Sequence, residues 1–411
     1  MSFSNNQQSD LLYFDLLITN VDTIYKAPKP VYFNETRTTP YLYEPEQYEM
    51  SVVRFSLDTQ TLPVIIPPII PAGPLNNNYP NPESPSPNGD PNKTLYAVSM
   101  SYQDNSGNNY IVERYVEYSP QDLSVDAPPP LIPNQTQDNS NGYYNIYSFQ
   151  YFISLINQTL NLCYQTLKGA VEIDGGTLPS DYAPVMLWNT DTEKATIYAD
   201  VLGYSPFLRP SPINLYFNPA LAQIFSTFSY LITPTANIAE INSFRAYQVL
   251  FTDVAQAIEL NTVPYPLNAL GTDQSPVLFQ ALQAKQELST INNMNPIISI
   301  VFTTNTIPII ATQVTTPLLY VDGQVQLSSI GNNNNISNVL TDFSADSPLR
   351  PYIYYVPTAE FRMISLVGNR PLNNIDVGVF YKTRTGDLVP FRLGSGGSAS
   401  LKLLFRRKGT K

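Results

Sequence analysis

Residues 375–408 read IDVGVFYKTRTGDLVPFRLGSGGSASLKLLFRRK and contain three strand-like segments separated by two turns. In the first segment, alternate side chains from Ile375 to Tyr381 are apolar, whereas Asp376 and Lys382 fall on the opposite face. This period of two predicts a strand with one buried face. The turns RTGD and GSGGS supply glycines, which accept positive φ angles without steric cost.

The last segment, ASLKLLF, repeats the alternation. Leu401, Leu403 and Phe405 share the side that we expect to face the core. Lys402 and Arg406 share the other side, which we expect to face solvent. The chain therefore closes with a strand that is an ordinary sheet element.

Further strand candidates occur at both ends of the chain. In YEMSVVRFSL, at 48–57, Val53, Phe55 and Leu57 are expected on one face. The other candidates are LLYFDLLITNV (11–21), RAYQVLFTDV (245–254), IISIVFTTNTIPII (297–310), NVLTDF (338–343), PYIYYVP (351–357) and FRMISLV (361–367).

The middle of the chain is less regular. One helix is clear at 145–170, where apolar residues recur at three- and four-residue spacing: Phe149, Phe152, Ile156, Leu160, Cys163 and Leu167. Hairpins are predicted at 94–119 and 184–200, and Asn218-Pro219 is expected to open a short helix. Proline-rich stretches at 62–93 and 120–142 predict extended arms or loops. Many short strands and few helices indicate a mainly β sandwich with insertions.

Charge is scarce and unevenly spread. Charged residues make up 13% of the 411 residues, against about 25% in typical soluble proteins. A neutral, tyrosine-rich surface is typical of a subunit that buries its exterior against neighbours, although a loop-rich β protein can also tolerate it. The net charge of −11 argues against general nucleic-acid binding. The basic tail with Lys402, Arg406, Arg407 and Lys408 could contact an acidic neighbour or nucleic acid, or remain solvated.

Most familiar catalytic chemistry is missing from the sequence. There is no histidine, which excludes Ser-His-Asp and Cys-His arrangements, and no glycine-rich phosphate loop. The single cysteine, Cys163, lies on the apolar stripe of the helix and is expected to be a buried thiol. A pair of carboxylates among the 33 acids remains possible. We expect no enzyme, and no catalytic, cofactor-binding or metal-binding residues.

The sequence shows neither a signal peptide at the N-terminus nor an apolar stretch long enough for a membrane helix. We therefore expect a protein that is made and kept in a reducing, soluble compartment and is not secreted.

The segment YKTRTGDLVPFRLGSGGSASLKLLFRRK resembles the end of the penton, or minor capsid, proteins of virophages and Polinton-like viruses. Other segments resemble the same family in the same order: YSFQYFISLINQTL, PVMLWNTDTEKATIYAD, INLYFNPALAQIF, NPIISIVFTTNTIPI and SNVLTDF. Together they cover 145–408 in patches, and the part before 145 matches no motif of the family.

The resemblance implies a jelly-roll β-sandwich or barrel with a large inserted region that contains a few helices. Residues 1–60 would supply its N-terminal strands, 61–290 the loops and inserted region with a helix at about 145–168, and 291–411 its C-terminal strands and basic tail. It also implies a structural protein of the virion, which forms a homopentamer at the fivefold vertices of an icosahedral double-stranded DNA virus. The expected partners are trimers of the major capsid protein and other minor capsid proteins.

Two other functions fit the residues. One is a β-sandwich module of a virion that recognises a host receptor or glycan, for which the tyrosine-rich stretch NSNGYYNIY (139–147) is the candidate surface. The other is a single jelly-roll protein that builds a whole shell.

Overall fold

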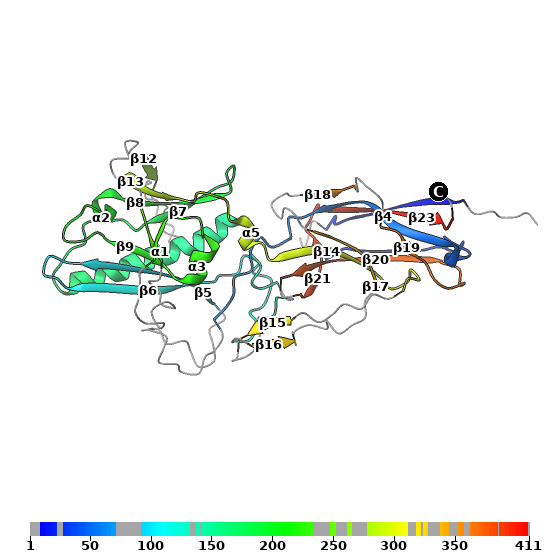
Figure 1. Ribbon diagram of the computed structural model, residues 1–411, viewed down its shortest axis with the longest axis horizontal. Coiled ribbons are helices and arrows are strands. Elements are labelled where there is room, and N and C mark those ends of the chain that lie inside the picture. Colours follow the sequence, from blue (N-terminus) through cyan, green and yellow to red (C-terminus); the bar gives the residue numbers. More distant parts are fainter. Residues whose placement is uncertain are drawn as a thin grey trace, which may run out of the picture. The chain divides into compact units, whose positions relative to one another are not determined.

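A computed structural model describes residues 9–22, 28–70, 92–131, 137–139, 142–232, 247–251, 261–264, 278–310, 318–321, 324–327, 338–344, 352–356, 362–384 and 386–409. The chain forms two compact units (Figure 1). The first combines Met1–Val64 with Pro296–Lys411, and the second is the continuous segment Ile65–Asn295. We call them the jelly-roll unit and the inserted unit.

Eight strands form the framework of the jelly-roll unit. They are β1 (Leu11–Thr19), β3 (Tyr32–Thr36), β4 (Tyr48–Asp58), β14 (Ile297–Thr304), β17 (Asn338–Ser344), β18 (Tyr352–Tyr355), β20 (Asn374–Thr383) and β23 (Ser398–Arg407). Shorter elements are β2 (Lys29–Pro30), the 3₁₀ helix η1 (Pro45–Gln47), β15 (Leu318–Val321), β16 (Gln324–Leu327), β19 (Ile364–Ser365), β21 (Leu388–Pro390) and β22 (Arg392–Leu393).

The strand order is that of a jelly roll. One sheet, here the β1 sheet, runs β1-β23-β4-β18, which is first, eighth, third and sixth among the eight strands in chain order. The other, the β14 sheet, runs β3-β20-β14-β17, which is second, seventh, fourth and fifth. The first strand pairs with the eighth, the second with the seventh, the third with the sixth and the fourth with the fifth, and all four pairs are antiparallel. In Figure 1, β23 (red) accordingly lies in the same sheet as β4 (blue). The expected jelly-roll fold is confirmed.

The alternation of strand directions gives this unit two distinct ends. At the connection end, β4 stops at Asp58 and β14 starts at Ile297, so the inserted unit interrupts the chain between the third and fourth strands. At the opposite, terminal end, β1 starts and β23 stops, and the amide of Arg407 donates to the carbonyl oxygen of Asp10 at 2.8 Å.

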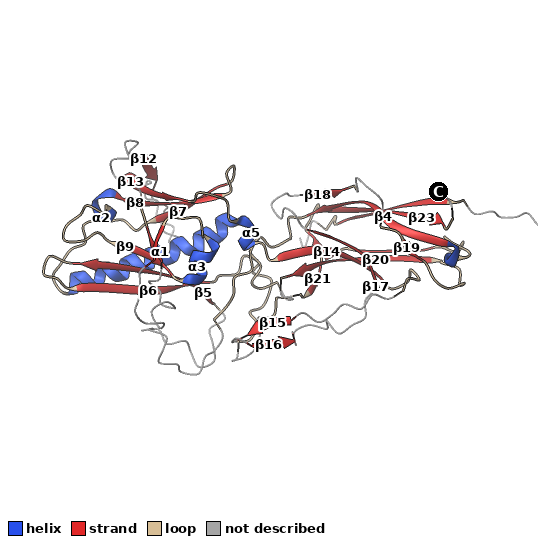
Figure 2. Cartoon of the chain, in the orientation of Figure 1, coloured by secondary structure: helices blue, strands red, loops and turns tan. Residues whose placement is uncertain are grey.

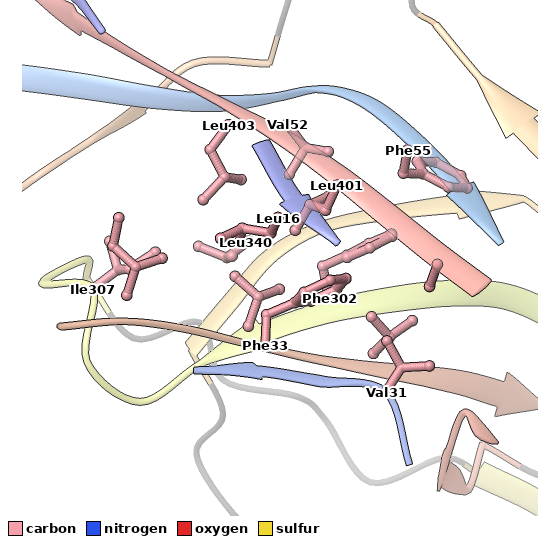
Figure 3. Close-up of a cluster of buried hydrophobic side chains, with 14 of the residues drawn as sticks. Leu16, Val31, Phe33, Val52, Phe55, Phe302, Ile307, Leu340, Leu401 and Leu403 are labelled. Atoms are coloured by element: carbon pink, nitrogen blue, oxygen red, sulfur yellow. The ribbon is translucent and has the colours of Figure 1, made fainter. Parts of the chain in front are cut away.

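Apolar side chains from both sheets fill the space between them (Figure 3). The Phe55 ring of the β1 sheet lies 5.1 Å from the Phe302 ring of the β14 sheet, measured between centroids. The expected inward faces are confirmed, because these residues are all buried in the shared core: Ile375, Val377, Val379 and Tyr381 of β20, and Leu401, Leu403 and Phe405 of β23.

One expected face of β4 is wrong. Lys402 pairs with Arg54 and Leu403 pairs with Val52, which leaves Val53 as an extra residue in a β-bulge. The bulge shifts the alternation by one position, so that Val52, rather than Val53, shares the core with Phe55. Because Val52 and Val53 are both apolar, the sequence does not show which of them is the extra residue of the bulge.

The inserted unit combines two sheets and one long helix (Figure 2). One sheet runs β10-β11-β9-β5-β6 and the other β12-β13-β8-β7. The elements are β5 (Lys93–Gln103), β6 (Asn109–Glu117), α1 (Phe149–Ile173), β7 (Val185–Asn189), β8 (Lys194–Asp200), α2 (Val201–Tyr204), β9 (Asn214–Phe217), α3 (Pro219–Ile224), β10 (Tyr230–Ile232), β11 (Tyr247–Val249), β12 (Asn261–Pro264), β13 (Leu278–Lys285) and α5 (Ile291–Met294).

Helix α1 is the expected helix, and it packs against both sheets of this unit. Its predicted apolar stripe is buried throughout: Phe149, Phe152, Ile156, Leu160, Cys163 and Leu167. The helix touches β5 and β6 on one side and β7 on the other. Toward β7, the side-chain amide of Asn157 donates to the carbonyl oxygen of Met186 at 2.8 Å, and its oxygen accepts from the Met186 amide at 2.7 Å. The Asn157 side chain thus makes the two hydrogen bonds with β7 that the backbone of a neighbouring strand would make.

Several local predictions for this unit are confirmed. The two expected hairpins are β5–β6 and β7–β8. Pro219 opens α3, and the Asn218 side chain accepts from the amide of Leu221 at 3.0 Å. The proline-rich stretch is described up to residue 70, where the chain is extended and buries Ile65 and Ile69; residues 71–91 lie outside the described part.

Candidate assembly surface

The outer face of the β1 sheet carries exposed apolar side chains at both of its edges. On β1, side chains alternate, so that Leu16 enters the core while Tyr13 and Leu17 point outward with 54% and 73% of their surface exposed. On β18, Tyr354 is 63% exposed and faces outward, opposite Ser56 of β4. Leu11 and Tyr352 extend the two edges. We call Leu11, Tyr13, Leu17, Tyr352 and Tyr354 the β1-sheet surface.

The middle strands of this surface are polar, and their polar groups are satisfied within the sheet. Leu17, Ser400 and Ser56 follow one another across three strands. The hydroxyl oxygens of the two serines lie 2.6 Å apart, within hydrogen-bond distance. A face of this kind loses few hydrogen bonds with water when a neighbour covers it.

The charges on the same surface are paired within the sheet, where one carboxylate is shared by two cations. Asp15, Lys402 and Arg54 lie in register on β1, β23 and β4. The Asp15 carboxylate is 3.3 Å from the ammonium nitrogen of Lys402 and 3.0 Å from the guanidinium of Arg54. The ammonium group also lies 5.4 Å from the centre of the Tyr13 ring. Exposed pairs of this kind contribute little to stability, but they lower the cost of removing the charges from water.

The basic tail is matched by acids and carbonyl oxygens of its own unit. Arg406 donates two hydrogen bonds to the carboxylate of Glu49, at 2.8 and 2.5 Å. Arg407 lies 3.9 Å from the Asp10 carboxylate, and the Lys408 ammonium donates to the carbonyl oxygen of Glu46 at 2.8 Å. These contacts hold the three side chains of the tail on their own unit.

The outer face of the β14 sheet is organised around a buried carboxylate. Asp376 of β20 has no exposed surface, although the alternation predicts that it faces solvent with Lys382. Its oxygens accept hydrogen bonds from the hydroxyls of Thr304 and Thr306 at 2.6 and 2.7 Å. The amides of Asn305 and Thr306 donate to it at 2.9 and 2.8 Å, and the Tyr32 hydroxyl donates at 2.9 Å.

These hydrogen bonds explain two features of the β14 sheet. First, β14 ends at Thr304, not near residue 310, because the chain turns there to wrap the Asp376 carboxylate. Second, burial alone would raise the pKa of Asp376, but the hydrogen bonds from Thr304, Thr306 and the two amides outweigh it and lower the pKa to about 2. The carboxylate is therefore ionised at neutral pH and fixes the turn.

The tyrosine-rich stretch proposed for recognition packs into the inserted unit. Tyr143 and Tyr144 are buried, and their rings contact one another at 4.9 Å between centroids. The Tyr143 hydroxyl donates to the side-chain oxygen of Asn92 at 3.0 Å. These two side chains serve the local core and offer no contact area to a ligand.

No group of three His, Cys, Asp or Glu side chains within the described ranges could hold a metal ion. Cys163 is buried as expected, and burial raises the pKa of its thiol to about 12. The single tryptophan, Trp188, stacks on Phe149 at 4.9 Å between ring centroids. None of the described helices is long and apolar enough to span a membrane.

The sequence offers a partial signal for the Asp376 site. The run Thr303-Thr304-Asn305-Thr306 is rich in hydroxyl and amide donors, which need an acceptor when they are buried. The acceptor lies on a strand 72 residues away along the chain, and a single sequence does not connect the two.

Comparison with known proteins agrees with this architecture. A family model described as "Sputnik minor capsid protein V18/19" matches residues 12–407, so the family match also covers the part before 145, for which the motifs gave no resemblance. Protein V18 of Sputnik virophage is 31% identical over 180 residues, which is 42% of this chain and 96% of V18. A chain in the cryo-electron microscopy structure of the Sputnik virophage superposes with a TM-score of 0.71 at 24% identity, over 98% of this chain and 99% of that one. The mavirus penton protein superposes with a TM-score of 0.52 at 16% identity, over 97% and 99%.

Proposed function

The chain belongs to the family of Sputnik minor capsid proteins V18/19, and from this premise we propose that it forms a homopentamer at the fivefold vertices of an icosahedral virophage-type capsid. Its role as a structural, penton-like capsid protein follows from the family. The pentamer, its place at the vertices and its contacts with trimers of the major capsid protein are the proposal.

The observation that carries this proposal is the β1-sheet surface. Its exposed leucines and tyrosines flank serines and charges that are already paired within the sheet. A neighbouring copy can cover such a surface by apolar contact without leaving a charge unpaired. Rotational symmetry then closes the ring, and no copy keeps an uncovered surface.

We further propose that the chain follows the expected domain plan, with the jelly roll as the capsid-building body and the middle region as an insertion. The division into Met1–Val64 with Pro296–Lys411 and the continuous Ile65–Asn295 supports this plan. We also propose that the protein is not an enzyme and that it is made in the host cytoplasm or a viral factory. The family of structural capsid proteins supports the first statement.

The test is the oligomeric state of the purified full-length chain, measured by sedimentation velocity over a range of concentrations. We expect a pentamer for the wild type. The double variant Leu17→Asp/Tyr354→Asp places two carboxylates on the β1-sheet surface, and we expect it to weaken association by about 100-fold or more. Leu123→Asp, compared with the double variant at about 500 mM NaCl, is the matched control, because Leu123 is 85% exposed in the inserted unit and a carboxylate there should change the dissociation constant by less than about twofold once salt screens it.

A wild-type chain that remains monomeric at high concentration and does not join particles would contradict the proposal. Copy number in purified virions separates the vertex protein from the alternative of a shell-forming protein. A vertex protein is scarce relative to the major capsid protein, whereas a shell former is dominant.

A further inference from the structure

The two units differ sharply in charge. The inserted unit, 65–295, has seven Lys and Arg residues against 19 Asp and Glu residues, which is a formal net charge of −12. The jelly-roll unit has 15 basic and 14 acidic residues, which is a net charge of +1. The whole net charge of −11 therefore resides in the inserted unit.

The acids of the inserted unit outnumber the cations that could pair with them. Seven basic residues cannot pair one to one with 19 acids, and the ion pair between Lys168 and Asp181 already uses one of the seven. Exposed acids of the inserted unit include Glu117, Asp126, Glu172 and Glu287. These four carboxylates lie at the surface, where counterions of the solvent must balance their charge.

The topology of the jelly roll attaches this charge to every copy in the same way. The chain leaves β4 and re-enters β14 at the connection end of the jelly-roll unit. In a ring with rotational symmetry, all copies are equivalent. Each copy that joins the ring therefore adds one inserted unit with a formal charge of −12 at an equivalent point of attachment.

We propose that the inserted unit acts as an electrostatic brake on assembly, so that copies of this chain close into a ring only when cations of the solvent screen its negative charge. This inference rests on the proposed pentamer. The Debye length is about 10 Å at 0.1 M salt and about 30 Å at 0.01 M, so repulsion between neighbouring copies is long-ranged in dilute salt and short-ranged in concentrated salt. The apolar β1-sheet surface attracts neighbouring copies, and the ionic strength determines whether this attraction exceeds the repulsion between the inserted units.

Sedimentation velocity of the full-length wild type at about 20 mM and at about 500 mM NaCl tests the brake. We expect the dissociation constant to fall at least about tenfold at the higher concentration. Because salt also strengthens apolar burial, charge variants must be compared at each ionic strength. In the dilute salt, Glu117→Gln/Glu172→Gln should tighten association about threefold, and the quadruple variant that adds Asp126→Asn and Glu287→Gln should tighten it about tenfold. In the concentrated salt, both variants should change the dissociation constant by less than about twofold.

The matched control is Glu44→Gln/Glu46→Gln, which removes two exposed charges from the terminal end of the jelly-roll unit. It should change the dissociation constant by less than about twofold at either salt concentration. Equal affinity of the wild type at both salt concentrations would overturn the brake and leave the pentamer standing, and so would an effect of the control as large as that of Glu117→Gln/Glu172→Gln. A wild type that stays monomeric at both concentrations would instead refute the pentamer.

Discussion

The hydroxyl of Tyr32 on β3 donates to the carboxylate of Asp376 on the adjacent strand β20, over 2.9 Å. The residue that pairs with Tyr32 in the ladder is Gly378, and the tyrosine ring lies across it. The ring passes within 3.7 Å of the position that a Cβ of residue 378 would take, and its hydroxyl reaches the carboxylate two residues away. The first and last thirds of the chain are joined at this point.

Replacing Asp376 by asparagine should destabilise the jelly-roll unit. The substitution keeps the shape of the side chain but removes the charge that the hydroxyls of Thr304 and Thr306 and two amides stabilise. We expect a loss of about 3 kcal/mol in the free energy of unfolding, measured by urea denaturation. Asp342→Asn is the control, because the ion pair of Asp342 with Arg362 is exposed and should be worth less than about 1 kcal/mol.

Stability should fall in acid in a way that depends on Asp376. The pKa of this carboxyl is about 2 in the folded protein, against an ordinary value of 3.8, so its contribution is fully present above pH 3.8. It is lost as the pH falls from there toward 2, because the unfolded chain then binds the proton more readily. The difference corresponds to roughly 2 kcal/mol. Urea titrations between about pH 6 and about pH 2 should show this decline in the wild type and a smaller one in Asp376→Asn. Equal declines in both proteins would contradict the assignment.

Gly378→Ala should strain the outer face of the β14 sheet. An added Cβ would lie 3.0 Å from Cε2 of Phe380 and 3.2 Å from the hydroxyl oxygen of Thr303, both closer than ordinary contacts. We expect a cost of about 1–2 kcal/mol in the free energy of unfolding. Gly169→Ala is an informative comparison, because Gly169 lies in α1 with open space around its Cα and should gain about 0.5–1 kcal/mol of helix stability.

Asn157→Ala should weaken the contact between α1 and β7. It removes both hydrogen bonds to Met186 and leaves the amide and carbonyl of that residue without this partner. We expect a loss of about 2–3 kcal/mol in the free energy of unfolding and faster hydrogen exchange at the Met186 amide. Thr166→Ala, which removes an exposed hydroxyl on the same helix, should cost less than about 0.5 kcal/mol. Similar losses in the two variants would show that the two hydrogen bonds of Asn157 to Met186 stabilise the fold no more than the exposed hydroxyl of Thr166 does.

Cys163 should react with thiol reagents only when the inserted unit opens. The thiol has no exposed surface, and burial raises its pKa to about 12, so thiolate is scarce at about pH 8. We expect labelling at that pH to be at least about 100-fold slower than in urea-unfolded protein. Rapid labelling of the native chain would show that α1 separates readily from β6.

The strand faces and the long helix could be predicted because they depend on local periodicity. The alternation from Ile375 to Tyr381 and the stripe from Phe149 to Leu167 each bury one side against a core, and the pattern alone specifies which side. The same holds for the cap at Asn218, where the asparagine and the following proline are both local signals.

Features that depend on partners far apart in the chain could not be predicted. The bulge at Val53 exists because β23 pairs with both halves of β4, and an alternating pattern has no mark for an extra residue. Alternation places Asp376 in solvent because it says nothing of a turn that returns from β14 to cover the carboxylate. Of the β1-sheet surface, the sequence shows only the low overall charge, because the pairing of Asp15 with Lys402 and Arg54 requires three strands from different parts of the chain.

The pairing of β1 with β23 sets an order of events during synthesis. Ribosomes release residues from the N-terminus, so β1 must wait for its neighbour until β23 has emerged. The inserted unit is continuous and has all its strands and α1 available earlier. It is thus able to fold while β1, β3 and β4 remain unpaired, and the jelly-roll unit is completed after it. A newly made chain therefore cannot present its β1-sheet surface before β23 has left the ribosome.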